Sequence, residues 1–269
     1  MKAGDFREHC RQVAHWVDWD RTVDQFMHGD PNTAVRGIAV TWLATNARIR
    51  EAAALGLNFV ICHEGAFYPR YAGTPSEDRH HAEKHGLMDQ LGITLMRCHD
   101  TWDRMPEAGI VDSWAKFLGF PTESRPVESF YRVCLPSGRT VVEVAQAVLE
   151  RVSVLGQQFV GIVGDREAPV ERMVVGTGAI TRLPDMYDLG ADLVLATDDG
   201  ITTTASGLWS LDLGVPMLII NHATAELPGM QLLAGYVEHQ FPGVPVRYLP
   251  GEFPYQVVTE PQWPPFSGS

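Results

Sequence analysis

Short apolar runs alternate with amphipathic segments along the first half of the chain. Apolar runs of about four to eight residues, rich in β-branched side chains, are typical of buried strands, whereas apolar positions three and four apart are typical of helices. The pattern predicts strands over 36–42, 58–62 and 93–98, and helices over 46–55, 77–90 and 107–118. Strands that alternate with helices predict a parallel sheet with crossover helices.

The middle of the chain departs from this pattern, which returns from residue 173 onward. Strands are predicted over 127–135 and 158–164, and Thr140 and Glu143 form the capping box of a helix between them. The second half predicts strands over 173–178, 190–197, 214–221 and 244–249, with helices that end at 189 and cover 201–212 and 227–241. Segments 54–65 and 188–200 resemble each other, which indicates a duplicated α/β unit. The proline-rich tail over 261–269 is predicted to be loose.

Composition and charge narrow the range of functions. The chain has 269 residues, 45% apolar and 20% charged, as in a globular protein with a sizeable core. Its net charge of −12 argues against nucleic acid as a partner, since phosphate contacts need a surplus of Lys and Arg. No apolar run approaches the ~20 residues of a membrane-spanning helix, and no signal peptide is evident. The four cysteines show no CxxC spacing, so we expect a cytoplasmic protein without membrane contact.

Potential metal ligands lie at the ends of three predicted strands. Each strand ends in a histidine with a carboxylate either next to it or four residues later: His63 and Glu64, His99 and Asp103, His222 and Glu226. Ligands of open parallel sheets bind at the carboxyl ends of the strands. Imidazole and carboxylate suit divalent transition metals, and six such ligands are enough for two ions. One histidine at a strand end is more often a cap or a solvated residue, but three with partner carboxylates favour a metal site.

The spacing within each pair predicts whether its two side chains point apart or toward the same ion. His63 and Glu64 are adjacent, so we expect them to diverge and to reach different ions. The histidine and carboxylate of each other pair are four residues apart and converge if the segment starts a helical turn.

Other candidates have simpler explanations. His80, His81 and His85 are surrounded by charged residues, which favours a solvated helix face or a flexible lid over a second metal site. Cys62 and Cys98 precede two of the site histidines, but strand alternation points them away, as core residues. The glycine-rich segment 176–180 lacks the spacing of a phosphate-binding loop and predicts a tight turn. Hydroxyl groups over 200–207 predict a helix cap or a substrate contact.

Five stretches of the chain are similar to the NIF3-like family of dinuclear metal proteins, often described as GTP cyclohydrolase I type 2 homologues: 37–68, 99–103, 118–120, 190–200 and 221–241. The family's HxxxD and HxxxE motifs are intact, so the resemblance implies metal-ligand roles for His99, Asp103, His222 and Glu226. The family's His-His pair is His63-Glu64 here, so His63 keeps its role by position. Asp198-Asp199 stand where the family tends to have Gly-Glu. These departures indicate a divergent member.

The resemblance also implies a fold and an assembly. We expect an α/β protein of two similar lobes with mostly parallel sheets, a metal site in the cleft between the lobes, and a homohexamer. The whole chain 1–269 would be one unit, with lobe one over about 1–125 plus the C-terminal segment and lobe two over about 126–250. The short 121–172 stretch predicts the version of the fold without an inserted extra domain.

We therefore expect a metal-dependent hydrolase that binds two divalent ions of zinc, iron or manganese. Glu64 as a carboxylate disfavours copper. The ions would activate a water that attacks a carbonyl, amidine or ring carbon of a small polar substrate. Glu64 or Glu226 would orient or deprotonate that water, and we expect substrate contacts from Arg79, His81 and Asp199. The alternative is a non-catalytic metal-binding or assembly protein, or a partner-binding scaffold; an oxygenase is a third possibility.

Overall fold

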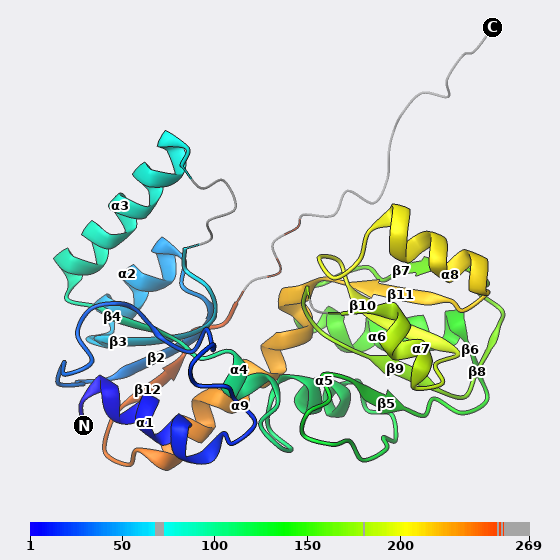
Figure 1. Cartoon of the computed structure of the whole chain (residues 1–269), viewed down its shortest axis with the longest axis horizontal. Helices are drawn as coiled ribbons and strands as arrows, with labels where there is room; N and C mark the ends of the chain where they lie inside the picture. The colour runs from blue at the N-terminus through cyan, green and yellow to red at the C-terminus, as the bar shows by residue number, and fades with distance from the viewer. Residues whose placement is uncertain (68–72, 180, 252, 254, 256–269) are drawn as a thin grey trace, which may run out of the picture.

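Two sheets of five strands form the framework of the molecule (Figure 1). The computed structural model describes residues 1–67, 73–179, 181–251, 253 and 255, so the tail over 261–269 lies outside the described residues. The fold class expected from the sequence is confirmed, because the strands between the sheet edges are parallel and helices cover both faces. Among the described residues, no helix has the length and apolar character needed to cross a membrane.

The first sheet has the strand order β1-β4-β3-β2-β12. Its strands are β1 (Phe26–His28), β2 (Ile38–Leu43), β3 (Phe59–Glu64), β4 (Thr94–Arg97) and β12 (Val246–Tyr248). All neighbours are parallel except the edge strand β1, which is antiparallel to β4. Helices α2 (Asn46–Ala54) and α3 (Pro75–Leu91) cover one face, and α1 (Ala3–Val13) covers the other together with the long helix α9 (His222–Gln240).

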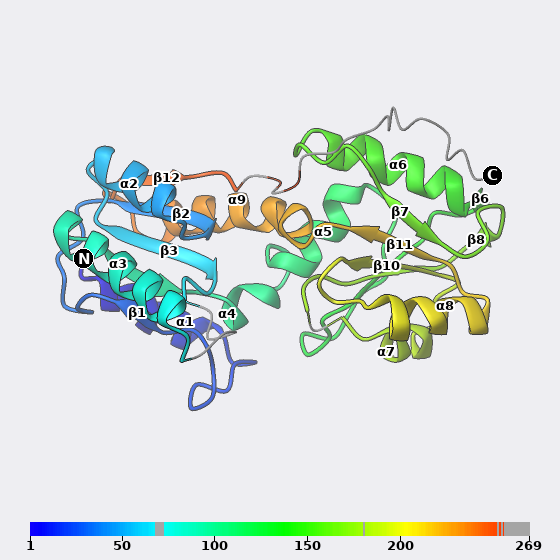
Figure 2. The same cartoon turned by 90° about the horizontal axis from the view of Figure 1, so that it is seen from above.

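The second sheet repeats this plan with the strand order β5-β9-β10-β11-β7. Its strands are β5 (Arg132–Cys134), β7 (Gly161–Val163), β9 (Met173–Val175), β10 (Leu193–Thr197) and β11 (Met217–Ile220). The three central strands are parallel, and both edge strands are antiparallel. Helix α6 (Val141–Ser153) lies on one face; α7 (Leu183–Asp188) and α8 (Leu208–Leu213) lie on the other (Figure 2). A small ribbon of β6 (Arg139–Thr140) and β8 (Pro169–Val170) completes this half.

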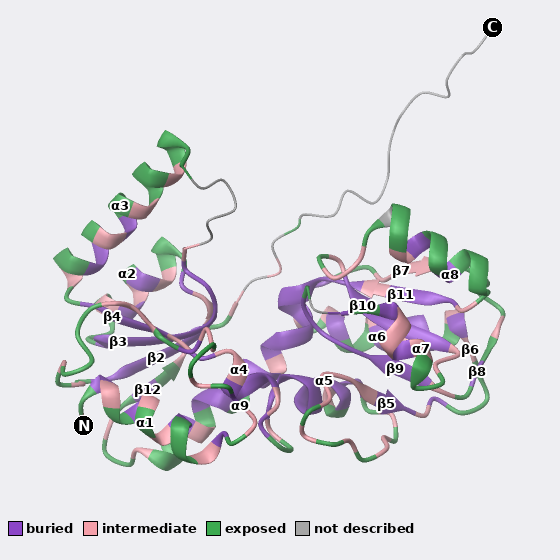
Figure 3. Cartoon of the chain, viewed as in Figure 1, coloured by how far each residue is buried: buried purple, intermediate pink, exposed green. Residues whose placement is uncertain are grey.

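Two helices connect the two hydrophobic cores. Helix α5 (Ile110–Leu118) contributes Ile110 to the core under the first sheet and Trp114 to the core under the second. Helix α9 does the same with Met230 and Ala225. The two helices touch closely, because a Cβ on Gly229 of α9 would lie 2.7 Å from Cδ1 of Ile110. Figure 3 shows this central junction buried. The relative placement of the sheets is therefore fixed by side-chain packing.

Several predicted boundaries differ from the observed ones. Helix α9 begins at His222, five residues before the predicted start at Leu227, and therefore contains Pro228 in its interior. Strand β3 continues through His63 and Glu64 and does not end before them. The predicted helix over 201–212 is a π-helical turn (Thr203–Gly207) followed by α8. The capping box of Thr140 and Glu143 at the start of α6 is confirmed.

Candidate metal centre

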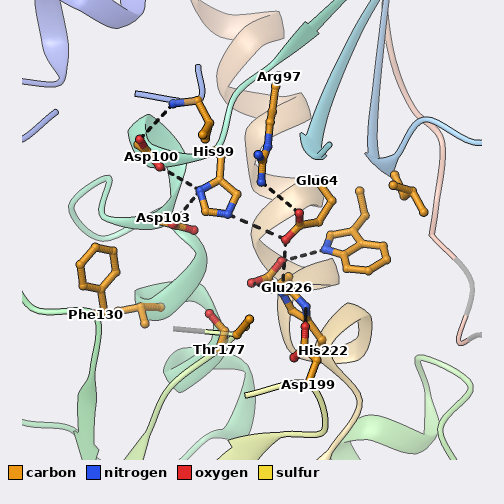
Figure 4. A pocket seen from close by; sticks show the side chains of 16 residues that line it. Glu64, Arg97, His99, Asp100, Asp103, Phe130, Thr177, Asp199, His222 and Glu226 are labelled. Atoms are coloured by element: carbon orange, nitrogen blue, oxygen red, sulfur yellow. Dashed lines mark hydrogen bonds and ion pairs between the residues drawn. The ribbon is translucent and has the colours of Figure 1, made fainter. Parts of the chain in front are cut away.

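The carboxyl ends of the two parallel sheets face one cavity of about 670 Å³. Residues at or just after β2, β3 and β4 line it from one side, and residues just after β9, β10 and β11 line it from the other. Apolar side chains such as Val111 and Phe130 complete its wall. The short helix α4 (Asp100–Asp103), which follows β4, brings further polar groups to it. Figure 4 shows the polar side chains of both sides pointing toward one another.

The six potential metal ligands form one cluster beside this cavity. Among them, His63 on β3 is completely buried. Its Nδ1 lies 3.1 Å from the carbonyl oxygen of Cys98, so Nδ1 must carry a proton and donate it. Its Nε2 lies 3.3 Å from Oδ1 of Asp103 and 3.4 Å from Oε2 of Glu226, yet it makes no hydrogen bond in the described chain. A buried nitrogen between two carboxylates is a position that a cation stabilises.

His99 is the residue before α4, and its ring stacks on His63 with 4.5 Å between the centroids. Its Nδ1 lies 3.0 Å from Oδ1 of Asp100 and 3.2 Å from Oδ2 of Asp103. The other nitrogen, Nε2, faces Oε1 of Glu64 at 3.8 Å. The one-turn helix α4 explains why histidine and aspartate four residues apart converge, as the spacing predicted.

His222 and Glu226 occupy the first turns of α9, one above the other. Nδ1 of His222 donates to Oδ2 of Asp199 over 2.7 Å, and its Nε2 lies 2.9 Å from Oε1 of Glu226 and 3.6 Å from Oε1 of Glu64. The indole Nε1 of Trp42 donates to Oε2 of Glu226 over 2.8 Å. Each carboxylate oxygen of Glu226 therefore has a fixed neighbour, which holds the side chain toward the cluster.

The two oxygens of Glu64 have different surroundings. Oε2 accepts a hydrogen bond from Nη2 of Arg97 over 3.0 Å, and Arg97 also donates from Nε to the backbone oxygen of His63 over 2.9 Å. Oε1 lies between the Nε2 atoms of His99 and His222. His63 and Glu64 thus both reach the same cluster, although adjacent strand residues were expected to diverge toward different ions. Glu64 can do so because it is the last residue of β3.

The chemistry of these donors fits divalent metal ions. Each of the three imidazoles has Nδ1 next to an oxygen acceptor, an arrangement that leaves the lone pair of Nε2 directed at the cluster. Ligand atoms of His63, His99 and Asp103 lie within 4.8 Å of one another, and so do those of His63, Glu64 and Glu226. The buried Nε2 atoms of His63 and His222 have no hydrogen-bond partner in the described chain. His63 belongs to both groups, and Nε2 of His222 lies beside Glu64 and Glu226 of the second group, so ions bound here would contact both nitrogen atoms.

In the absence of a metal ion, protons bind the Nε2 atoms of these histidines. Burial lowers the pKa of His222, but Glu226 and Asp199 outweigh it and raise the pKa to about 11. Burial likewise lowers the pKa of His99, while Asp103, Asp100 and Glu64 raise it to about 9. A metal ion bound here would therefore compete with protons for the same nitrogen atoms.

Comparison with known proteins places this chain in a family. The family model described as Duf34/NIF3 (NGG1p interacting factor 3) matches residues 5–251. The chain belongs to the Duf34/NIF3 family. The expected family membership is thereby confirmed. No protein with a curated description matches the chain.

Solved structures share the Duf34/NIF3 fold. Protein YbgI, described as of unknown function, is 19% identical with a TM-score of 0.78, and the match covers 95% of this chain and 100% of that chain. Hypothetical protein SA1388 of Staphylococcus aureus is 16% identical with a TM-score of 0.75, over 96% and 99%. Reduced HcgD from Methanocaldococcus jannaschii is 16% identical with a TM-score of 0.70, over 93% and 98%. At these identities the likeness shows the fold alone.

Two aspartates to which the sequence assigned no role hold the backbone of this Duf34/NIF3 protein next to the cluster. Buried Asp24 accepts hydrogen bonds from the backbone N–H groups of His99, Asp100 and Thr101 over 2.6 to 2.9 Å. It lies 75 residues before His99, so no local pattern could reveal it. Asp198 accepts from the backbone N–H of His222 over 3.1 Å. The family resemblance drew attention to Asp198 by its position but gave it no role.

The expected substrate contacts divide into two groups. Asp199 lines the cavity, whereas Arg79 and His81 lie on α3 and do not line it. Helix α3 packs on the first sheet through its second half, so its first half, with Arg79, projects into solvent. His81 instead packs against Phe67, with 5.1 Å between the ring centroids.

Other sequence candidates have structural roles. His80 is exposed, as a solvated helix face requires, but His85 is half-buried and its Nδ1 lies 2.9 Å from that of His28. Cys62 and Cys98 are buried core residues as predicted, and burial raises the pKa of Cys62 to about 12. In the 200–207 segment, the hydroxyl of Thr202 caps the following turn by accepting from the backbone N–H of Ala205 over 3.1 Å.

Proposed function

We propose that this protein is a metal-dependent hydrolase with a two-ion site. One observation supports the proposal above all: three imidazole Nε2 atoms and the carboxylates of Glu64, Asp103 and Glu226 converge beside a cavity of about 670 Å³. Structural metal sites are closed, whereas catalytic sites keep a position for water or substrate. The cavity therefore favours catalysis over a non-catalytic metal-binding role.

Surrounding groups fix the proposed ligands in place. The carbonyl of Cys98 and the carboxylates of Asp100 and Asp199 accept from the Nδ1 atoms of the three histidines, which selects the tautomer with Nε2 as the ligand. Trp42 and Arg97 hold the outer oxygens of Glu226 and Glu64. Two divalent ions of zinc, iron or manganese would supply an activated water and polarise the bond under attack.

The carboxylates of Glu64 and Glu226 are also the groups best placed to orient or deprotonate that water. Both lie in the buried part of the cluster, where the ions would bind. The volume of the cavity suits a small molecule, and its mixed wall of Phe130, Val111 and polar groups suits a small polar substrate with an amide, amidine or ring carbon. Asp199 is the remaining expected substrate contact on this wall.

The test begins with the metal content of protein purified without chelator. Protein stripped of metal and protein reloaded with zinc, iron or manganese are then screened on amides, lactams, cyclic ureas and nucleotides. We expect hydrolysis that disappears on stripping and returns with one ion. His99→Asn should lose metal and activity, whereas the matched control His80→Ala, on the exposed face of α3, should retain both.

Bound metal without turnover on any of these substrates would favour a metal-binding or assembly protein. Oxygen consumption in the presence of substrate would point to an oxygenase. The homohexamer implied by the family resemblance stays a prediction, which light scattering after size-exclusion chromatography tests. The cytoplasmic location also stays a prediction, which cell fractionation tests.

A further inference from the structure

The turn that follows β9 forms part of the cavity wall through Thr177, Gly178 and Ala179. The sequence predicted a tight turn for this glycine-rich segment, and Gly178 has a left-handed φ of +72°. Successive backbone N–H groups in turns with a left-handed residue form concavities that bind anions. The metal cluster does not use these groups, so their role needs a separate explanation.

The turn presents hydrogen-bond donors that have no acceptor. In the part of the chain that the structure describes, the backbone N–H groups of Thr177, Gly178 and Ala179 donate no hydrogen bond. Thr177 is only 8% exposed, and its hydroxyl has no partner among the described residues either. Figure 4 shows this side chain at the cavity below the ligand cluster. Polar groups of buried residues are nearly always paired, so the hydroxyl of Thr177 indicates a bound partner that accepts hydrogen bonds, and the N–H of the exposed Ala179 is accessible to the same partner.

The direction of one donor follows from the peptide plane. The carbonyl oxygen of Gly178 accepts from the backbone N–H of Thr181 over 3.2 Å, from its hydroxyl over 2.9 Å, and from the hydroxyl of Thr197 over 3.3 Å. The N–H of Ala179 belongs to the same trans peptide and therefore points the opposite way. That N–H is therefore directed away from Thr181 and Thr197, and it belongs to a residue that lines the cavity.

The turn is also very close to the proposed metal ligands. A Cβ at position 178 would lie 3.1 Å from Nε2 of His222 and 3.7 Å from Oε1 of Glu226, so only glycine lets the backbone approach this far. The nearby acid Asp199 is already paired with His222 and with the hydroxyl of Thr197. Two divalent ions would outweigh the charge of the three ligand carboxylates and leave the centre positive, which favours an anion beside it.

We propose that the turn of Thr177, Gly178 and Ala179 binds an acidic group of the substrate, a carboxylate or a phosphate, next to the metal centre. This inference rests on the proposed function and names its substrate class: small acids. The hydroxyl of Thr177 and the three backbone N–H groups donate to the oxygens of the acidic group. The bond to be hydrolysed then lies within reach of the cluster, because the turn touches His222.

The test measures anion binding to zinc-loaded protein by calorimetry, with inorganic phosphate and with malonate as probes. Thr177→Val removes the hydroxyl at constant shape, and we expect binding to weaken roughly tenfold, as for a lost hydrogen bond to a charged group. Thr177→Ser should restore most of it. Ala179→Pro removes one N–H and should also weaken binding. The control Thr204→Val changes an exposed threonine outside this cavity and should have no effect.

The zinc content of every variant is measured, so loss of the ions is separated from loss of the anion contact. No turnover is needed, and the result therefore stands apart from the success or failure of the hydrolase screen. Comparison of the two probes shows whether phosphate or carboxylate is preferred. If both probes bind fully loaded Thr177→Val as tightly as the wild type, the anion sits on the ions alone and the proposal is wrong. Absence of binding by the wild type overturns it as well.

Discussion

Metal uptake by this site should release protons, because the histidines that face the cluster are protonated when it is empty. The pKa of His222 is raised to about 11, chiefly by Glu226 and Asp199 against the effect of burial. The pKa of His99 is raised to about 9, chiefly by Asp103 against the same effect. At pH 7.5 both rings carry a proton in the metal-free protein. A metal ion at Nε2 displaces that proton.

The expected release is about two protons per chain at pH 7.5, one from each ring. His63, whose pKa is also raised by Glu226 and Asp103 against burial, adds to this number. By linkage, the logarithm of the overall metal-binding constant should rise by about two per pH unit between pH 7 and 9. Between about pH 9 and 11 His99 has lost its proton while His222 still holds one, so the slope should fall by about one.

The folding stability of the metal-free protein should fall as the pH rises, whereas metal binding should become stronger. Both pKa values are raised in the folded protein, so their stabilisation is complete below about pH 6.5 and is lost as the pH rises through about 9 and then about 11. For His99, a shift from 6.5 to about 9 corresponds to roughly 3 kcal/mol. Urea unfolding of stripped protein should therefore show falling stability from pH 7 to 10.

Calorimetric titration of stripped protein with Zn²⁺ in buffers of different ionisation enthalpy measures the proton count directly. His80→Ala serves as control, since this exposed residue lies outside the cavity. A release of less than one proton per chain at pH 7.5 would show that the rings are neutral before the metal arrives. The inference that carboxylates hold the imidazoles as cations would then be refuted.

Other substitutions test single contacts. Glu64→Gln removes a charged ligand oxygen, so elemental analysis should show about one ion per chain where the wild type and Glu64→His hold about two; retained ions with no activity would instead mark Glu64 as a base. Arg97→Ala leaves Glu64 without its hydrogen-bonded ion pair and should weaken metal binding by about 1–3 kcal/mol in competition with a chelator, with partial recovery in Arg97→Lys. Gly229→Ala places a methyl group against Ile110 and should lower the free energy of unfolding by about 1–3 kcal/mol in urea. Gly235→Ala, in the same helix with nothing within 4 Å of the new methyl, should raise it by up to about 1 kcal/mol; equal effects at both positions would contradict this reasoning.

Much of the fold was predictable because its central strands are buried on both faces. Such strands appear as continuous apolar runs, and those at 58–62 and 93–98 were recognised for this reason. Elements with few apolar residues were missed, among them the edge strand β1 and helix α1, although Ala3, Phe6 and Cys10 form a buried face on α1 at helical spacing. The start of α9 was placed five residues too late, although its first turns carry His222 and Glu226 and pack Ala225 into the core of the second sheet.

At the candidate site, the sequence predicted residues that act through their own strand or helical turn. His99 and Asp103 were found because a spacing of four residues has a direct geometric meaning. Arg97 was not singled out, because its role depends on a neighbouring strand: it crosses from β4 to the last residue of β3 and binds Glu64 there. The sequence showed that Glu64 stands where the family has a histidine. That Arg97 neutralises the outer oxygen of Glu64 could be recognised only from the fold.

The packing of α9 explains how ligands from distant parts of the chain keep a fixed geometry. Its first turns carry His222 and Glu226 and insert Ala225 into the core of the second sheet. Its second half inserts Met230 and Leu233 into the core of the first sheet. Exposing two such side chains costs roughly 3–6 kcal/mol, so separating the two sheets is strongly disfavoured. The cluster is therefore preorganised by the two hydrophobic cores, which bring the proposed metal ligands together without the help of an ion.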